Sequence, residues 1–460
     1  MLHLNETVVA VSTPIGESGI AVIRMTGSQA VDVADRIFEG KKRLVDLKSH
    51  QAHHGQIMES GEPIDDVVVT IFKKPKSYTG EDLVEISCHG GIYICRKILD
   101  LAVKNGAIPA EPGEFTRRAF FNGKIDLAQA EAVADLIHAK TETARRVAMY
   151  QYKGNLSNMI KSIKEKLMQA ISKLELELDF IEEDIGLVSK EELLNLIQSI
   201  REEVQKFIRT YDRGRIFREG LRTVIVGKPN VGKSSVLNAL LERDRAIVTA
   251  IPGTTRDTVE DVMDLDGLLV KLIDTAGIHE TQDPIEIEGL KRTENAVDTA
   301  DLILLILDGS QEMQQEDQQL IHRFNCGNGK HLVLVVNKSD LQQKIDFVEI
   351  EEVAKKGNCL KISALKGYNI DRLTEIIKNS YHERMPCHDE ILLTNARHRN
   401  ALVLAEKKLT QAQKSILQNM SQEFIALDIR GAMEALEEIL GRATPEDILN
   451  KIFSEFCIGK

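Results

Sequence analysis

The residues with the clearest chemistry form the loop GKPNVGKS, which runs from Gly227 to Ser234. This loop follows the apolar run 223–226 and precedes the helical pattern 235–241, the strand–loop–helix order of a phosphate-binding P-loop. Glycines let the backbone wrap a polyphosphate with its N–H groups pointing inward, and the helix N-terminus adds partial positive charge. We therefore expect Lys233 to reach the β- and γ-phosphates and the Ser234 hydroxyl to ligate Mg²⁺.

Four further motifs follow in the order typical of a guanine-nucleotide switch: GTTRD at 253–257, DTAG at 274–277, NKSD at 337–340 and SAL at 363–365. A threonine of GTTRD can close over Mg²⁺ and the γ-phosphate. In DTAG, the aspartate belongs beside Mg²⁺ and the glycine N–H can sense the γ-phosphate. The last residue of NKSD can accept two hydrogen bonds from guanine, and adenine would leave it unsatisfied. These motifs predict binding of GTP rather than ATP.

The residues expected to contact the nucleotide belong to these motifs and to the loop that leads into GTTRD. They are Asn230, Val231, Gly232, Lys233, Ser234, Ser235, Thr249, Ala250, Ile251, Pro252, Gly253, Thr254, Thr255, Asp274, Thr275, Ala276, Gly277, Asn337, Lys338, Ser339, Asp340, Ser363, Ala364 and Leu365. Strand-like runs alternate with helical patterns between residues 217 and 379, which predicts a mostly parallel, doubly wound sheet around the site.

Hydrolysis of GTP requires a group that positions the attacking water. Ile278 follows the DTAG motif, so the glutamine that serves this purpose in Ras-like enzymes is missing. Glu286 can accept from a water directly or through a second water. It is one of several acidic residues in the following loop, with Glu280, Asp283 and Glu288.

Asn230 lies inside the P-loop, and two interpretations of its side chain remain open. Its carbonyl can hold a cation against the phosphates, which would stabilise transition-state charge as an arginine finger does. Alternatively, the side chain supports its own turn, as asparagine often does in loops.

The remaining chain predicts α/β plus all-α architecture. Residues 1–121 alternate strand-like and helical patterns and predict an α/β domain, whereas residues 122–216 and 380–460 carry apolar residues every three or four positions and predict amphipathic helices. We expect the two helical blocks to form one split bundle into which the nucleotide domain, 217–379, is inserted. The arginines between residues 213 and 222 are interpreted as a hinge or surface, with RNA contact as the alternative.

Composition limits the function classes. The net charge is −12 and tryptophan is absent, so neither a global basic field nor an aromatic platform for single-stranded nucleic acid is expected. The six cysteines lack metal-ligand spacing, which is typical of reduced thiols in a cytosolic protein. The sequence shows no signal peptide and no apolar run approaching ~18 residues, which predicts a soluble, cytoplasmic protein.

Three segments, with the motifs above, carry a family resemblance: PGEFT at 112–116, NGKIDLAQAEA at 122–132 and the terminal CIGK at 457–460. Over essentially the whole chain, the sequence resembles the bacterial tRNA-modification GTPases of the MnmE (TrmE) family. The resemblance implies a homodimer formed through an N-terminal domain similar to folate-binding domains. It also implies binding of 5-formyl- or 5,10-methylene-tetrahydrofolate. The matching residues are Arg24, Glu85, Lys124 and Lys460, which pattern alone would assign mostly to solvated positions.

The resemblance further implies catalysis assisted by K⁺ and Mg²⁺. Asn230, Thr249, Ile251 and Thr254 match the positions around K⁺, Ser234 and Thr255 match the Mg²⁺ ligands, and Glu286 matches the acid that positions water through a bridging water. With an FAD-dependent, MnmG-like partner in a heterotetramer, the family adds an aminomethyl or carboxymethylaminomethyl group to the 5-position of the tRNA wobble uridine.

The terminal segment also raises two separate questions. Cys457 is a candidate thiol nucleophile towards uridine, although the sequence shows no activating base near it. The last four residues formally fit a prenylation box, but Gly459 and Lys460 are poor choices for its last two places. A docked C-terminus is the favoured interpretation.

The sequence favours tRNA modification over two other classes of GTPase function. Ribosome-assembly GTPases similar to Era and Der share the P-loop and GTTRD chemistry, but they lack the N-terminal α/β domain and the split helical domain. A membrane-remodelling GTPase needs an amphipathic or apolar membrane element, which the sequence does not present. The favoured function is therefore that of a GTP hydrolase in tRNA modification.

Overall fold

The computed structural model describes residues 6–179, 190–243, 260–274, 296–325, 331–347, 350, 358–382, 390–442 and 444–460. The chain folds into two compact units. One comprises residues 1–137, 150–201 and 401–460, and the other comprises residues 138–149 and 202–400.

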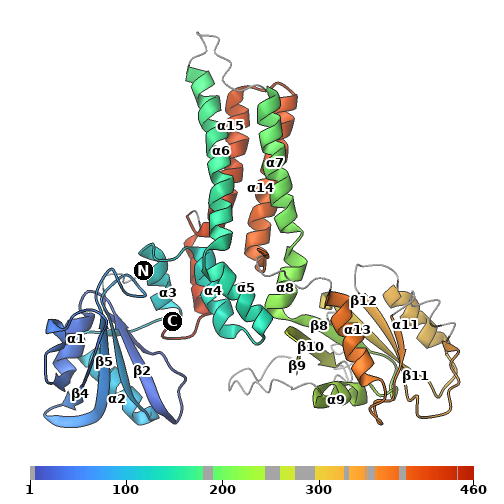
Figure 1. The fold of residues 1–460 in the computed structure, drawn as a ribbon, viewed down its shortest axis with the longest axis horizontal. Coiled ribbons are helices and arrows are strands. Elements are labelled where there is room, and N and C mark those ends of the chain that lie inside the picture. The colour runs from blue at the N-terminus through green and yellow to red at the C-terminus, as the bar shows by residue number, and fades with distance from the viewer. Residues whose placement is uncertain are drawn as a thin grey trace, which may run out of the picture. The chain divides into compact units, whose positions relative to one another are not determined.

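The first unit begins with a sheet of strand order β3-β4-β5-β6-β2-β1-β7 (Figure 1). Its strands are β1 (Val8–Val11), β2 (Ser18–Thr26), β3 (Phe38–Gly40), β4 (Gln51–Glu59), β5 (Glu62–Phe72), β6 (Leu83–Gly90) and β7 (Ile108–Pro109). Neighbours pair antiparallel except β1 and β7, which are parallel. The α/β domain predicted for this region is present, and its sheet is largely antiparallel.

One face of this sheet is covered by α1 (Ala30–Ile37) and α2 (Ile92–Lys104). Side chains alternate across a strand, so Val67, Val69 and Ile71 of β5 turn towards the helices and are buried. They join Ile23 and Ile86 in the main core of the domain. A short 3₁₀ helix, η1 (Leu44–Asp46), closes the edge of this core.

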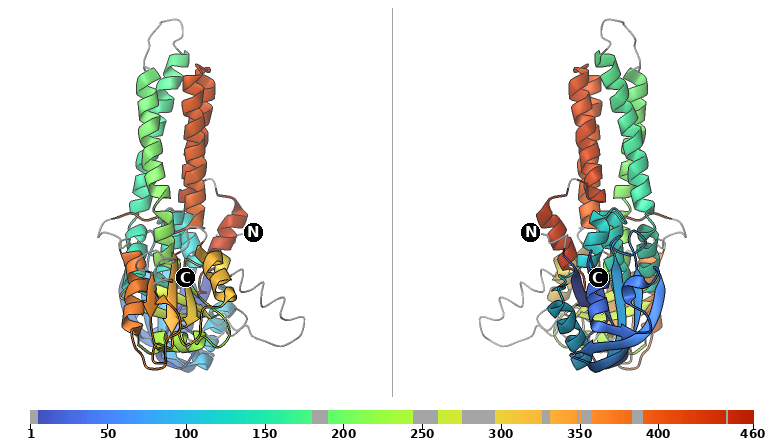
Figure 2. Two further views of the ribbon diagram at one scale, coloured as in Figure 1. Left: turned by 90° about the vertical axis from the view of Figure 1, so that its right-hand side faces the viewer. Right: turned by 90° about the vertical axis from the view of Figure 1, so that its left-hand side faces the viewer.

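The rest of the first unit is helical, and α5, α7 and α14 continue into the second unit. The helices are α3 (Glu114–Phe121), α4 (Leu127–His138), α5 (Glu142–Tyr152), α6 (Asn155–Asp179), α7 (Lys190–Ile208), α14 (Ala396–Leu417), α15 (Gln422–Leu440) and α16 (Glu446–Ser454). The long helices α6, α7, α14 and α15 lie side by side (Figures 1 and 2). The apolar repeat of α6 is buried at Leu156, Ile160, Ile163 and Leu167, as its spacing predicts. The split bundle expected from the two helical blocks is confirmed.

The second unit contains a sheet of order β13-β12-β11-β8-β10-β9. Its strands are β8 (Leu221–Val226), β9 (Glu260–Leu265), β10 (Leu268–Asp274), β11 (Leu302–Asp308), β12 (His331–Asn337) and β13 (Cys359–Lys361), with helices α8 (Tyr211–Glu219), α9 (Lys233–Arg243), α11 (Gln315–Asn325) and α13 (Ile370–His382). All neighbours pair parallel except β9 with β10. Separate cores on the two faces confirm the predicted doubly wound sheet.

Three of the arginines at the entry to this unit form intramolecular ion pairs: Arg213 with Glu390, Arg215 with Asp301 and Arg222 with Glu219. The Arg215 guanidinium bonds to the Asp301 carboxylate, which also accepts the backbone N–H of Arg222 at 3.0 Å. These contacts fix α8 against the start of β11. Among the described helices, none is both long and apolar enough to cross a membrane.

Candidate functional site

The P-loop connects β8 to α9, as the sequence predicts, and two glycines explain its tight path. Gly227 has φ +152° and Gly232 has φ +95°, both in the region that L side chains rarely adopt. A Cβ on Gly232 would lie 2.3 Å from Nδ2 of Asn337, and one on Gly227 would lie 2.4 Å from the carbonyl oxygen of Ile306. A side chain on Gly227 would therefore collide with backbone, and one on Gly232 would displace the Asn337 amide.

Lys233, the first residue of α9, is buried and its ammonium group turns back into the loop. Nζ donates to the carbonyl oxygens of Gly227 at 3.0 Å and Lys228 at 2.9 Å. Ser234 and Ser235 follow in the exposed first turn of the helix. The loop therefore carries an ammonium group and a helix N-terminus together, which is the combination that a polyphosphate requires.

The phosphate loop is tied to the base-recognition segments by a buried asparagine. Nδ2 of Asn337 donates to the carbonyl oxygen of Val231 at 2.9 Å, and its Oδ1 accepts the backbone N–H of Ala364 at 3.0 Å. One side chain thus joins the P-loop, the end of β12 and the SAL segment. The parallel strands bring these three segments to the same edge of the sheet, where doubly wound folds bind ligands.

Asp340 is exposed and points its carboxylate to the neighbouring SAL segment. The hydroxyl of Ser363 donates to Oδ1 of Asp340 at 2.5 Å. This hydrogen bond is the main reason that the pKa of Asp340 is lowered from its ordinary value. An ionised carboxylate has the acceptor capacity that guanine recognition needs. Leu365 is 81% exposed.

Several predicted nucleotide and metal residues cannot be placed in this geometry. They lie outside the described residues and are Thr249, Ala250, Ile251, Pro252, Gly253, Thr254, Thr255, Thr275, Ala276, Gly277 and Glu286. The backbone of Asp274 ends β10 and pairs with Ile225 of β8, so this position stands beside the start of the P-loop.

A second cluster lies on the face of the N-terminal sheet that does not carry α1 and α2. Arg24 of β2 is paired in register with Glu85 of β6. The guanidinium donates from Nη2 and Nε to Oε1 of Glu85, at 2.6 and 2.9 Å. The rings of Tyr78 and Phe115 have their centroids 5.9 and 5.7 Å from its Cζ atom. An ion pair and two cation–π contacts therefore fix the orientation of Arg24.

The C-terminus docks on this cluster. The carbonyl oxygen of Gly459 accepts from Nη1 of Arg24 at 3.3 Å and from the hydroxyl of Ser12 at 3.2 Å. The backbone N–H of Phe115 donates to the carbonyl oxygen of Lys460 at 3.0 Å. Burial, and secondarily the charge of Arg24, lowers the pKa of the Lys460 amine, although Glu85 opposes the shift. The structure thus has the docked terminus that was favoured over a prenylation signal.

The four predicted folate residues do not all meet. Arg24, Glu85 and Lys460 come together, whereas Lys124 is exposed and its Nζ donates to the carbonyl oxygen of Pro75 at 3.1 Å. Pro75 and Tyr78 belong to the same connection between β5 and β6, so Lys124 and Arg24 contact one loop from different places. Cys457 is exposed, and its carbonyl oxygen accepts from the N–H of Lys460 at 3.3 Å.

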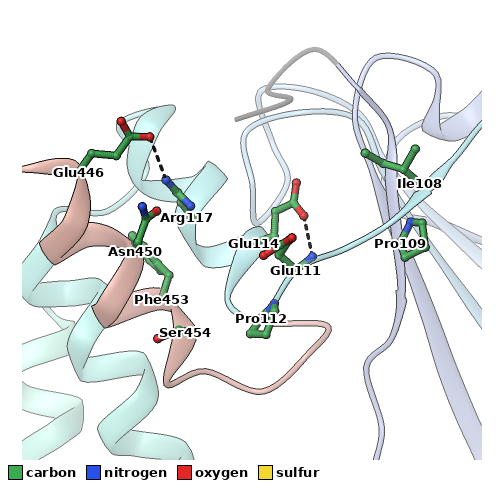
Figure 3. A pocket seen from close by; sticks show the side chains of 10 residues that line it. All are labelled: Ile108, Pro109, Glu111, Pro112, Glu114, Arg117, Glu446, Asn450, Phe453 and Ser454. Carbon is green, nitrogen blue, oxygen red and sulfur yellow. Dashed lines mark hydrogen bonds and ion pairs between the residues drawn. The ribbon is translucent and has the colours of Figure 1, made fainter. Parts of the chain in front are cut away.

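A pocket of about 490 Å³ lies between the β7–α3 connection and α16 (Figure 3). Charged and polar side chains line it beside Phe453. Burial lowers the pKa of Arg117, whose Nη2 lies 3.9 Å from Oε1 of Glu446. Its guanidinium stacks near the rings of Phe121 and Phe453, with centroids 5.8 and 6.0 Å from Cζ. Arg117 is thus part of the packing between α3 and α16.

The residues that hold the predicted site residues in place were not identified from the sequence. Ser12, Tyr78 and Phe115 surround Arg24 and the terminus, and Asp308 contacts Lys338 of the NKSD motif. Asp308 had a usable signal, because an aspartate that ends a continuous apolar strand beside the P-loop strand must lie at the ligand edge. The residues around Arg24 had none, since they meet only through strand register and chain reversal.

The doubly wound sheet, the glycine loop between β8 and α9, and the NKSD and SAL segments at adjacent strand ends define a P-loop GTPase. The family description "GTP-binding protein TrmE N-terminus" matches residues 7–124, and "MnmE helical domain" matches residues 127–457. The chain therefore belongs to the MnmE (TrmE) family of tRNA modification GTPases and is a GTP hydrolase.

Curated relatives match from end to end. The tRNA modification GTPase MnmE of Alkaliphilus oremlandii is 42% identical, with 100% of both chains covered. The protein of the same name from Thermoanaerobacter pseudethanolicus is 43% identical, with 99% of each chain covered. A crystal structure of Era from Aquifex aeolicus is 28% identical over 40% of this chain and 65% of its own, with a TM-score of 0.28.

Proposed function

We propose that this GTPase is activated by K⁺ and acts with an FAD-dependent, MnmG-like partner on the wobble uridine of tRNA. The two proteins would add an aminomethyl or carboxymethylaminomethyl group to its 5-position, with the one-carbon unit supplied by 5-formyl- or 5,10-methylene-tetrahydrofolate. The observation that carries the proposal is the chain terminus docked on the Arg24–Glu85 pair, in a chain similar along its length to proteins named for tRNA modification.

Arg24 and Lys460 suit a folate by their charge. Tetrahydrofolates carry carboxylates and a pterin ring with hydrogen-bond donors and acceptors. Arg24 and Lys460 offer cationic donors, and Glu85 offers an acceptor, with the amine of Lys460 held close to Arg24 at a depressed pKa. An anionic ligand would relieve the repulsion between the two cations. Lys124 is assigned to the same ligand as a more distant contact.

Calorimetric titration of 5-formyl-tetrahydrofolate into the full chain, and into a chain that lacks Lys460, tests this site. Binding that weakens on truncation is the expected result, because the truncation removes one cation and moves the terminal carboxylate. Equal binding by both forms would remove Lys460 from the site. Absence of binding in both would refute the folate assignment and leave a GTPase without a modification substrate.

In the nucleotide site, we assign phosphate binding to Lys233 and Mg²⁺ to Ser234 and Thr255. Asn230, with Thr249, Ile251 and Thr254, is assigned to K⁺. Asn230 is the one residue of these four that the structure describes. It is exposed on the P-loop and has a left-handed backbone with φ 62°, a position that is consistent with an ion beside the loop. The same conformation also suits the alternative in which Asn230 supports its turn.

Exchange of K⁺ for Na⁺ at equal ionic strength separates these two roles of Asn230. Hydrolysis should slow sharply in Na⁺, and Asn230→Ala should remove the difference between the two ions. Equal rates of the unchanged protein in both salts would refute the cation role. Hydrolysis that stays K⁺-dependent in Asn230→Ala would assign the ion to other ligands.

Formation of a homodimer through the N-terminal domain is part of the same proposal. Ile15, Ile20, Ile92 and Tyr93 are each more than half exposed. Ile92 and Tyr93 open α2 directly after the end of β6, and that end pairs with Ser18, two residues before Ile20. Exposed apolar clusters of this kind favour an interface. Light scattering should give twice the chain mass, and Tyr93→Glu should lower it; a monomeric unchanged protein would refute the dimer.

The remaining partners are tested with the same purified protein. Mixed with an MnmG-like FAD protein, it should form a heterotetramer and modify tRNA in a reaction that requires GTP, K⁺ and folate. Cys457→Ser then tests the exposed thiol. Full modification by this variant would exclude a nucleophilic role for Cys457.

A further inference from the structure

Asp308 ends β11 at the edge of the sheet that carries the P-loop. β11 pairs with β8 on one side and with β12 on the other, where Asp308 is opposite Asn337. The Asp308 residue is 8% exposed. Its register therefore places a carboxylate between the phosphate loop and the NKSD motif.

Four donors satisfy this carboxylate, and the longest of the four hydrogen bonds comes from Nε2 of Gln311 to Oδ2 at 3.3 Å. Oδ2 accepts Nζ of Lys338 at 2.7 Å, and Oδ1 accepts the hydroxyl and backbone N–H of Ser310 at 2.7 and 3.0 Å. Burial alone would raise the pKa of Asp308, but the hydrogen bonds from Lys338 and Ser310 outweigh it and lower the pKa. Asp308 is ionised at neutral pH and forms a charge-assisted pair with Lys338.

Lys338 makes a second contact, which leads into the phosphate loop. Its Nζ donates to the carbonyl oxygen of Asn230 at 2.8 Å. Asn230 and Lys338 both have left-handed backbones, with φ 62° and 64°. Such conformations persist in non-glycine residues when surrounding contacts hold them. The hydrogen bond between Asn230 and Lys338 is one such contact.

We propose that Asp308 is a positioning residue for nucleotide binding. It fixes the ammonium group of Lys338, which in turn holds the Asn230 carbonyl and keeps the P-loop in its binding conformation before the nucleotide arrives. This inference rests on the proposed guanine-nucleotide site and adds a residue that acts without touching the nucleotide. A preformed P-loop loses less conformational freedom when the nucleotide binds. Asp308 should therefore increase the affinity for the nucleotide.

Asp308→Asn is the direct test, because it keeps the size of the side chain and removes the charge. Loss of a charge-assisted hydrogen bond predicts a rise of roughly ten- to a hundredfold in the dissociation constants of GDP and GTP. A change in kcat at saturating GTP can accompany the loss of affinity, because Lys338 contacts Asn230, the residue assigned to K⁺. Unchanged affinity would overturn the proposal, as would a loss confined to kcat.

Asp317→Asn is the matched control. Oδ2 of Asp317 accepts Nζ of Lys228 at 2.6 Å, so this pair also joins a loop lysine to a mostly buried carboxylate. This pair connects the P-loop to α11 and, among the described residues, forms no hydrogen bond with the NKSD or SAL segments. Its loss should change nucleotide affinity by less than about threefold. A loss equal to that of Asp308→Asn would show that any buried ion pair near the loop has this effect and would overturn the specific role.

A variant of Lys338 separates positioning from a general structural role. If Asp308 acts through Lys338, Asp308→Asn should change affinity by less than about twofold in a Lys338→Met background. A full additional loss in that background would overturn the proposal. Ser310→Ala, which removes one donor and keeps the carboxylate, serves as the milder variant should Asp308→Asn fail to fold. It should weaken binding about two- to fivefold, and unchanged binding would count against the proposal.

Failure of this inference and failure of the proposed nucleotide site are distinguishable. The unchanged protein is titrated with GDP in every series, beside ADP. If it binds GDP and not ADP while Asp308→Asn binds equally well, only the role of Asp308 is wrong. If the unchanged protein does not prefer GDP, the guanine-specific site itself is refuted.

Discussion

Substitution of Gly459 by alanine should release the chain terminus. Gly459 has φ +88°, and a Cβ on it would lie 2.8 Å from both the Cα of Ser12 and the carbonyl oxygen of Val11. Both neighbours are backbone atoms at the C-terminal end of β1, so they cannot rotate away. The terminal segment must move instead.

The magnitude follows from the contacts that would be lost. The segment makes hydrogen bonds through Gly459 and Lys460 to Ser12, Arg24 and Phe115, at 3.2, 3.3 and 3.0 Å. At about 0.5–1.5 kcal/mol each, they hold the terminus by roughly 1.5–4.5 kcal/mol. Loss of that amount raises the undocked fraction by at least about tenfold, because 1.4 kcal/mol corresponds to a factor of ten.

Gly61→Ala provides a control with the same backbone strain. Gly61 has φ +87°, and nothing lies within 4 Å of the Cβ position. Both variants should therefore carry the left-handed strain of about 1–2 kcal/mol. Only Gly459→Ala should add the backbone collision.

The assay is the rate at which a carboxypeptidase removes Lys460, together with 5-formyl-tetrahydrofolate affinity and melting temperature. Gly459→Ala should accelerate cleavage by at least about tenfold and weaken binding, whereas Gly61→Ala should lower only the melting temperature. Cleavage at the rate of the unchanged protein in Gly459→Ala would refute the docking argument. Equal acceleration in Gly61→Ala would assign the effect to strain alone.

Three further predictions concern other sites. Glu286→Ala should retain GTP binding but lose most hydrolysis; near-normal single turnover would assign the water to another group. Asn337→Ala should lower the free energy of unfolding by about 1–3 kcal/mol in denaturant titrations and weaken GDP binding, because it leaves the Val231 carbonyl and the Ala364 N–H without their partner; a midpoint within error of the unchanged protein would contradict this. The exposed His89 ring bonds to Asp65 at 2.6 Å, which raises the pKa of His89. The resulting stabilisation should be fully present below the unfolded pKa of about 6.5 and be lost as pH rises through the folded pKa; an NMR titration in which Asp65→Asn leaves the histidine pKa unchanged would disprove the assignment.

The nucleotide site was predictable wherever its chemistry is local in the chain. A P-loop is one continuous strand, loop and helix, so the spacing from Gly227 to Ser234 carries both the conformation and the ligand. The apolar repeat of α6 likewise predicts which side of the helix is buried. Element type, the doubly wound sheet and the split bundle follow from such local patterns, because hydrophobic periodicity records which face is covered.

The tertiary structure alone decided which distant residues meet. Arg24 and Glu85 face one another because β2 and β6 pair in one register, and a shift of one residue would turn both side chains to the opposite face. The same folding brings Lys460 to them across the length of the chain and leaves Lys124 on Pro75. Asp308 reaches Lys338 because β11 and β12 end together. Residue types and spacing along the sequence do not predict these contacts. Each contact depends on strand register and on the path of the chain, and both are set by the packing of the whole domain.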